Sequence, residues 1–244
     1  MNIENKSQII NTFFNPYPIW VIDNFFNKST LKLIKEEWPN LDLDVWHKGH
    51  KYINGKKNIL EQGMRAISKL KDMPPYISSI LKYIHTEPFT KKISNLTGIK
   101  GLQTDKSMRW SGLRVMTPGS FQAIHSDARK DPKTGYRKEL TCLAYLNNDW
   151  KESQEGYFEV WDDNITKCIH KIKPLNNRLV IFLNTNKSYH GVPKVNFNRK
   201  SITWSILKKG ESEDRSKALF VSRPQDSEEI SKLGKERAYI KDIK

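Results

Sequence analysis

The sequence has little cysteine and no long apolar run. Only Cys142 and Cys168 occur among its 244 residues, so no disulfide framework holds the fold. No stretch of about 18 apolar residues is present, and a transmembrane helix is therefore not expected. The N-terminus, MNIENKSQII, is polar where a signal peptide needs a long apolar run. We therefore expect a protein of the reducing cytoplasm, without a membrane span.

Acidic residues are too few to balance the basic ones, and the formal net charge of +15 raises the question of a nucleic-acid partner. The basic residues are scattered, however, with short clusters only at 48–57, 69–71, 91–92 and 129–138. We therefore expect no nucleic-acid partner. A polyanionic or phosphorylated substrate fits the charge at least as well. The sequence predicts no oligomeric state.

The second half of the chain contains short runs rich in β-branched and aromatic residues, separated by Asn, Asp, Pro and Gly. Eight strands are predicted, at 113–117, 121–127, 139–146, 156–161, 168–173, 178–183, 188–193 and 199–207. Short strands at this spacing favour a β-sandwich or a jelly roll.

Helical patterns lie on both sides of these strands. They are predicted at 29–38, as two helices within 73–99 that end at Gly98, and at 227–243. The fold class expected is mainly β with flanking helices (α+β), and the core a double-stranded β-helix, or jelly roll, braced by N-terminal helices. We predict one domain in three parts: a support region at 1–111, the jelly-roll catalytic core at 112–209, and a charged linker and helix at 210–244.

Two histidines, an aspartate and an arginine have a spacing that suggests a metal site. His125 and Asp127 lie at i and i+2 of a predicted strand and therefore point to one face. His190 lies on the seventh predicted strand, and Arg199 begins the eighth. Two imidazoles and one carboxylate leave half of a metal's coordination positions open, as in non-haem Fe(II) oxygenases, and a guanidinium suits a carboxylate ligand. The alternatives to a functional site are that His125 and Asp127 form a hydrogen bond in a surface turn and that Arg199 is a solvated surface charge.

The same residues lie in segments that resemble a known family, the prolyl-4-hydroxylase-like branch of the Fe(II)/2-oxoglutarate-dependent oxygenases. The resemblance covers most of residues 16–209. It is densest in HSD (125–127), LTCLAYLNNDW (140–150), NRLVIFLNTNKSYHGVP (177–193) and RKSITW (199–204).

The resemblance implies a set of site residues and cofactors. The catalytic metal ligands would be His125, Asp127 and His190, and the 2-oxoglutarate-binding residues Arg199, Tyr145 and Thr203. The implied cofactors are Fe(II), 2-oxoglutarate and O₂, with ascorbate as a candidate reductant. One departure concerns the residue before the Pro-Gly turn, where many relatives carry a tyrosine that helps to hold the cosubstrate and this chain has Thr117.

The implied activity is a dioxygenase that hydroxylates an unactivated C–H bond. Segment 140–150 is similar to the branch that hydroxylates prolines in oxygen-sensing proteins, which favours a prolyl residue of a peptide or protein as the substrate. The same chemistry on a small molecule or sugar stays open, as does a non-catalytic jelly-roll protein, with or without metal. A nucleic-acid demethylase is disfavoured because Ser205 stands where such enzymes have a second arginine, and a cupin-type isomerase would not need Arg199.

Two further features have interpretations. The polar stretch 47–57 has the composition of a mobile loop, and such loops often cover the mouth of this kind of site. Trp110, Trp150 and Trp161 lie near the predicted active strands, and one of them is a candidate to line the substrate pocket.

Overall fold

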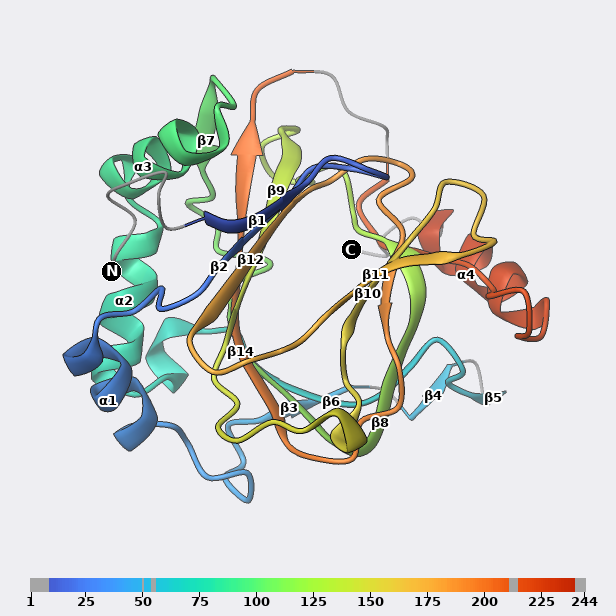
Figure 1. Ribbon diagram of the computed structural model, residues 1–244, viewed down its shortest axis with the longest axis horizontal. Coiled ribbons are helices and arrows are strands. Elements are labelled where there is room, and N and C mark those ends of the chain that lie inside the picture. The colour runs from blue at the N-terminus through green and yellow to red at the C-terminus, as the bar shows by residue number, and fades with distance from the viewer. Residues whose placement is uncertain (1–8, 50, 54–55, 211–214, 240–244) are drawn as a thin grey trace.

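The computed structural model describes residues 9–49, 51–53, 56–210 and 215–239. A curled antiparallel sheet forms its body, with helices α1 to α3 on one side and α4 on the other (Figure 1). The main path of the sheet runs β1 (Ile9–Phe13), β2 (Ile19–Ile22), β12 (Arg178–Leu183), β9 (Arg137–Tyr145), β14 (Arg199–Lys208), β8 (Gly112–Ser126), β13 (His190–Val192), β10 (Phe158–Trp161) and β11 (Cys168–Ile172). This arrangement confirms the jelly-roll expectation.

Four further strands pair with this sheet off its main path. They are β3 (His47–Lys48), β6 (Glu61–Ile67), β7 (Leu102–Thr104) and β15 (Leu219–Phe220), while β4 (Tyr52–Ile53) and β5 (Lys56–Lys57) form a separate hairpin. The helices are α1 (Lys28–Glu36), α2 (Pro75–Ile84), α3 (Glu87–Thr97) and α4 (Glu229–Tyr239), with short 3₁₀ turns at Leu70–Asp72 and Glu152–Gln154. None of the described helices is long and apolar enough to cross a bilayer.

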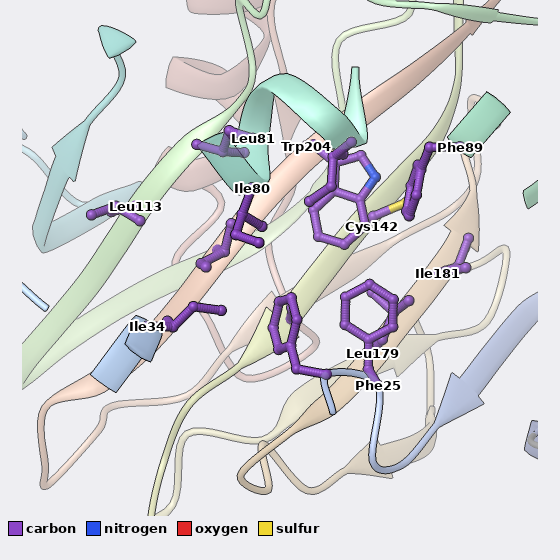
Figure 2. Close-up of a cluster of buried hydrophobic side chains, with 14 of the residues drawn as sticks. Phe25, Ile34, Ile80, Leu81, Phe89, Leu113, Cys142, Leu179, Ile181 and Trp204 are labelled. Carbon is purple, nitrogen blue, oxygen red and sulfur yellow. The ribbon is translucent and has the colours of Figure 1, made fainter. Parts of the chain in front are cut away.

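Successive side chains of the central strands point alternately to the two faces of the sheet. On β14, Ile202, Trp204 and Ile206 pack in the core below the helices, whereas Ser201 and Thr203 face the interior of the roll. Figure 2 shows the core on the helix side, where the Trp204 ring lies 6.1 Å from the ring of Phe89 in α3, centroid to centroid. The helices therefore brace the face of the sheet that points away from the site.

The helices begin and end where the sequence supplies the signals. The Asn27 side chain accepts a hydrogen bond from the Thr30 amide and caps α1. Pro75 is the first residue of α2, and α3 ends at Gly98 with φ of 77°, a backbone conformation that favours glycine. These boundaries agree with the predicted helices at 29–38 and 73–99. The predicted helix 227–243 corresponds to α4, and residues 240–243 lie outside the described part.

Several elements differ from the expectation. The first two predicted strands form one strand, β8, because residues 117–120 make an irregularity in its pairing with β6 rather than a chain reversal. The stretch 47–57, expected as a loop, contains β3 and the β4–β5 hairpin, with residues 50, 54 and 55 outside the described part. The segment expected as a charged linker contains β15, which pairs with the end of β8.

Candidate active site

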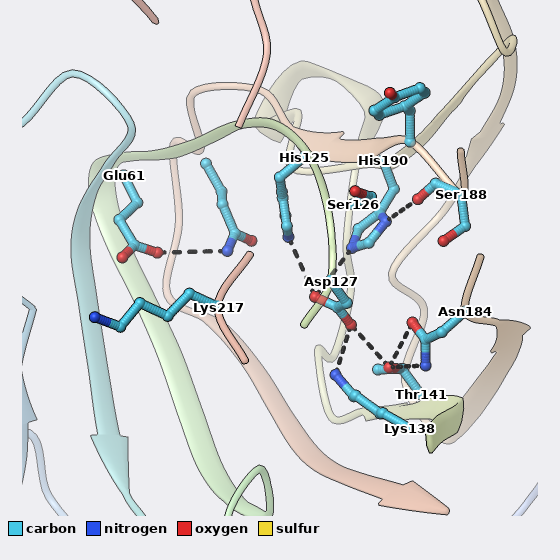
Figure 3. A network of polar contacts seen from close by, with 12 residues as sticks. Glu61, His125, Ser126, Asp127, Lys138, Thr141, Asn184, Ser188, His190 and Lys217 are labelled. Atoms are coloured by element: carbon cyan, nitrogen blue, oxygen red, sulfur yellow. Dashed lines mark hydrogen bonds and ion pairs between the residues drawn. The ribbon is translucent and has the colours of Figure 1, made fainter. Parts of the chain in front are cut away.

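The two histidines are brought together by strand pairing. His125, near the end of β8, lies directly opposite His190, the first residue of β13, and their ring centroids are 4.2 Å apart. Asp127 follows the last residue of β8, and its Oδ1 lies 3.6 Å from Nε2 of His125 and 3.8 Å from Nε2 of His190. Figure 3 shows both rings turned toward this carboxylate. The three residues predicted as metal ligands therefore converge at one end of the roll.

Backbone carbonyls fix the proton on each imidazole. Nδ1 of His125 lies 2.9 Å from the Ala123 oxygen, and Nδ1 of His190 lies 2.8 Å from the Ser188 oxygen. A carbonyl oxygen only accepts, so each Nδ1 carries the hydrogen and donates it. Burial, followed by the nearby His125, lowers the pKa of His190 to about 3. His190 is therefore neutral at pH 7, and its Nε2 lone pair points toward the carboxylate.

Asp127 is held in place by its second oxygen. Oδ2 accepts hydrogen bonds from Nζ of Lys138 at 2.7 Å and from the hydroxyl of Thr141 at 2.8 Å. The Thr141 oxygen in turn accepts from the side-chain amide of Asn184 (Figure 3). Burial alone would raise the pKa of Asp127, but the nearby ammonium of Lys138 holds it well below its usual range. The carboxylate is therefore ionised, with Oδ1 directed at the histidines.

This donor set fits a divalent metal ion. One ligand atom from each of the three residues lies within 4.8 Å of the others. With His190 neutral and Asp127 ionised, no hydrogen lies between Nε2 of His190 and Oδ1 of Asp127, so these two lone pairs face one another. Such a cluster lacks a positive charge at its centre, which a cation would supply. Two imidazoles and a carboxylate are the ligand set of non-haem Fe(II) centres.

Aromatic rings surround the histidines. The Phe220 ring of β15 stacks on His125 with centroids 4.8 Å apart, and Phe158 and Phe182 lie 5.2 and 4.7 Å from the His190 ring. These contacts leave little room for the rings to rotate. They also keep one side of the site apolar, which strengthens electrostatic interactions within it.

Arg199 and Tyr145 form a second polar group in the interior of the roll. Nη2 of Arg199 donates to the Tyr145 hydroxyl at 2.9 Å, and Nε donates to the Gly156 carbonyl at 2.7 Å. Burial raises the pKa of Tyr145, so its hydroxyl is protonated at neutral pH. Because this oxygen accepts from Arg199, its own hydrogen remains to be donated. A guanidinium and a phenol arranged in this way suit a carboxylate oxygen.

One cavity of about 240 Å³ connects these groups. Its lining includes His125, Asp127, His190, Arg199 and Thr203. Ligand clefts typically measure about 300–1,000 Å³, so this one suits a small cosubstrate and a side-chain-sized part of a second molecule. The predicted metal ligands and the predicted cosubstrate residues Arg199 and Thr203 therefore share a single chamber.

The other residues considered for the cosubstrate lie in different places relative to the cavity. Thr203 lines the cavity and its hydroxyl lies 3.4 Å from the Trp110 carbonyl, while Tyr145 lies behind Arg199. Thr117 lines a different groove, beside Lys51 and Lys57, and its hydroxyl points to Ser120 and the Gly63 carbonyl. A tyrosine-like role for Thr117 toward the cosubstrate is therefore not supported by its position.

Of the three tryptophans considered, only Trp110 lines the cavity. Trp150 packs against Tyr157, and the indole N–H of Trp161 donates to Glu159. The structure also brings to the site residues that the sequence does not predict there: Lys138, Thr141, Asn184, Phe220 and Arg114. No sequence signal points to Lys138, because a residue three positions before an inward-facing Thr is expected on the opposite face of a strand. Lys138 and Thr141 both line the cavity because the pairing of β9 with β14 shifts register between them. Phe220 lies in a segment for which no strand is predicted.

The comparisons with known proteins agree with this geometry. Residues 111–206 match the family model of the 2OG-Fe(II) oxygenase superfamily. The search of curated proteins gave no match. The family match agrees with the resemblance to the Fe(II)/2-oxoglutarate oxygenases and supports the general oxygenase reaction.

Solved structures with a similar fold include two prolyl hydroxylases. A prolyl-4-hydroxylase from Pseudomonas putida has a TM-score of 0.59 and 16% identity, over 79% of this chain and 93% of that chain. A prolyl hydroxylase from Trichoplax adhaerens, in complex with a peptide fragment of the hypoxia inducible factor oxygen degradation domain, has a TM-score of 0.55 and 19% identity, over 78% and 83%. At these identities the likeness establishes the shared fold.

Proposed function

We propose that the chain is an Fe(II)- and 2-oxoglutarate-dependent dioxygenase in which His125, Asp127 and His190 hold the metal. Arg199 and Tyr145 bind the distal carboxylate of 2-oxoglutarate, and Thr203 lies beside it. The observation that carries this proposal is the convergence of three metal-binding lone pairs in the same cavity as a guanidinium.

The cofactors supply the difficult chemistry. When bound, Fe(II) and 2-oxoglutarate together couple the oxidative decarboxylation of the cosubstrate by O₂ to hydroxylation of a C–H bond. Ascorbate, as reductant, and a reducing cytoplasm would keep the iron ferrous.

The protein supplies position and a sheltered environment. The Ala123 and Ser188 carbonyls hold both imidazoles with Nε2 ready to bind, so binding requires no change of tautomer. Lys138 and Thr141 occupy one oxygen of Asp127 and leave the other for the metal. The surrounding phenylalanine rings limit the access of water to this end of the cavity.

For the primary substrate we propose a prolyl residue in a peptide or protein. Segment 140–150, which contains Thr141 and Tyr145, resembles the third strand of hydroxylases that act on prolines. The fold likeness to the Trichoplax adhaerens enzyme, whose structure contains a peptide fragment, supports the same class. A cavity of about 240 Å³ would admit one proline ring beside the cosubstrate.

The test is succinate formation by the Fe(II)-loaded protein with 2-oxoglutarate and O₂, on a library of proline-containing peptides beside a panel of sugar nucleotides. We expect succinate release together with a mass gain of one oxygen atom on a peptide. Matched peptides with alanine in place of proline, and the Asp127→Ala variant, serve as controls. Turnover only with sugar nucleotides would replace the prolyl assignment, and no turnover with any member would count against both.

A further inference from the structure

Arg114 is a further cation that lines the same cavity, and the proposed function assigns it to neither the metal nor 2-oxoglutarate. It lies on β8 opposite Ser201 of β14, and Met116, two residues further on, lies opposite Arg199. The side chains of Arg114, Met116, Arg199 and Ser201 all line the cavity. Arg114 and Arg199 are therefore diagonal neighbours on the inner face of one strand pair.

The charges of the cavity leave Arg114 without a counter-ion. Among the described lining residues the cations are Lys138, Arg199 and Arg114, and the one carboxylate is Asp127. Lys138 pairs with Asp127 at 2.7 Å. Arg199 is assigned to the distal carboxylate of 2-oxoglutarate under the proposed function. Arg114 has no acidic partner in the part of the chain that the structure describes.

The hydrogen bonds of Arg114 leave most of its donors available. Nη1 donates to the Leu113 carbonyl at 3.0 Å and to the Ser68 hydroxyl at 3.2 Å. Within the described residues, Nε and Nη2 have no protein acceptor. Desolvation by burial lowers the pKa of Arg114 to about 10, so the guanidinium stays charged at pH 7. A charge taken partly out of water in this way is costly unless an anion accompanies it.

The two arginines point apart, so one anion does not serve both. Arg199 extends toward Gly156 and Tyr145. Arg114 extends toward Ser68 and the backbone at Gly112, where a Cβ would lie 3.0 Å from its Nη1. An anion on the free edge of Arg114 therefore belongs to a second molecule rather than to the carboxylate that Arg199 binds.

We infer that Arg114 forms an anion subsite for the primary substrate, which carries a carboxylate or phosphate group that enters the cavity beside Ser201. This inference rests on the proposed function and narrows its substrate. A planar guanidinium binds either oxyanion through two parallel hydrogen bonds, and the Ser201 hydroxyl on the facing strand supplies a further donor. For a peptide substrate, the group is a C-terminal, acidic or phosphorylated residue close to the one that is hydroxylated.

The experiment compares matched ligands that differ in charge. Isothermal titration of the anaerobic Fe(II) protein, with saturating 2-oxoglutarate so that Arg199 is occupied, uses N-acetyl amino acids and their uncharged amides. A second arm uses amino-acid amides with and without an O-phosphate, which separates phosphate from carboxylate. We expect the wild type to bind an anionic member at least about tenfold more tightly than its neutral partner.

Variants assign that preference to a residue. Arg114→Gln should abolish it, and Arg114→Lys should keep part of it, which covers the case in which the glutamine variant folds poorly. Arg109→Gln is the matched control, because Arg109 is exposed and does not line the cavity, and it should keep the full preference. A wild type without preference, or an Arg114→Gln variant that retains it, would overturn the subsite.

Two readouts separate this inference from the proposed function. If Arg114→Gln instead weakens 2-oxoglutarate binding, Arg114 serves the cosubstrate and the subsite is wrong while the oxygenase assignment stands. If the wild type binds no Fe(II) with 2-oxoglutarate, the proposed function fails. The charge preference is then measured on the protein alone, where its loss in Arg114→Gln would still support the subsite.

Discussion

Replacement of Arg199 is a sharp test of the cosubstrate site, because this side chain lines the cavity and also makes hydrogen bonds that stabilise the fold. Nε and Nη2 donate to the Gly156 carbonyl and the Tyr145 hydroxyl, while Nη1 has only the Met116 sulfur, at 3.8 Å. Arg199 lines the cavity. Hydrogen bonds to a charged group contribute about 1.5–3 kcal/mol, so Arg199→Ala should weaken 2-oxoglutarate binding roughly 10- to 150-fold.

The same substitution should also lower the free energy of unfolding. It leaves the buried Gly156 carbonyl without a donor, which costs about 1–3 kcal/mol, and it removes a packed side chain. The assay is anaerobic titration of 2-oxoglutarate into the Fe(II) protein, with thermal melting in parallel. Fe(II) affinity without cosubstrate should stay unchanged, because Arg199 is no part of the metal cluster.

Arg178→Ala is the matched control for Arg199→Ala. Like Arg199, Arg178 donates hydrogen bonds from Nε and Nη2, in its case to the Asp23 carboxylate, but it lies outside the cavity lining. Arg178→Ala should therefore lower the free energy of unfolding without changing the affinity for 2-oxoglutarate. A folded Arg199→Ala variant that binds 2-oxoglutarate as tightly as the wild type would refute the assignment.

Three further outcomes are expected. Tyr145→Phe should raise the Kd of 2-oxoglutarate about 2- to 10-fold, because one neutral hydrogen bond contributes about 0.5–1.5 kcal/mol; an unchanged Kd by titration would exclude the contact. Asp127→Ala should abolish Fe(II) binding. It should also leave the buried Lys138 unpaired and lower the free energy of unfolding, measured in urea, by ~3 kcal/mol. Adding Lys138→Met to that variant should restore part of the lost stability. Fe(II) at 100 times its Kd should stabilise the wild type by about 2.7 kcal/mol and a chelator should reverse this, whereas an equal effect on Asp127→Ala would place the metal elsewhere.

Much of the fold could be predicted because the strands carry strong local signals. Runs such as 178–183 and 199–207 combine β-branched residues with polar boundaries, and both correspond to strands in the structure. Gly98 and Pro75 marked helix boundaries for stereochemical reasons. The sequence predicts two strands separated by Pro118-Gly119, whereas the structure has one strand with an irregular pairing there, because Pro-Gly is compatible with a turn or with such an irregularity. The division of the chain into three parts of one domain stays a prediction.

The candidate site could be predicted in part. The spacing of His125, Asp127, His190 and Arg199 identified them as candidates, since few surface patterns combine these residue types. The structure brings the first three together around one point. Their assignment as ligands stays a prediction until metal binding is measured. Lys138 and Arg114 could not be found in this way, because a basic residue among 42 Lys and Arg carries no signal of its own until the fold shows which side it faces.

The C-terminal segment shows the limit of local patterns most clearly. Phe220 lies in a short apolar run, 218–221, within a charged and polar segment, and it stacks on His125. The buried Arg215 donates to the Ser126 carbonyl. Both contacts join residues far apart in the sequence. They depend on β15 pairing with the end of β8, which no periodicity within 210–225 predicts.

The central claim is that His125, Asp127 and His190 bind ferrous iron in a form that accepts 2-oxoglutarate. The most direct measurement is the visible absorption spectrum of the purified protein under anaerobic conditions, with Fe(II) added first and 2-oxoglutarate second. We expect a weak charge-transfer band that appears only with both and is absent from Asp127→Ala. A folded wild-type protein that develops no band at saturating concentrations of both would contradict the account.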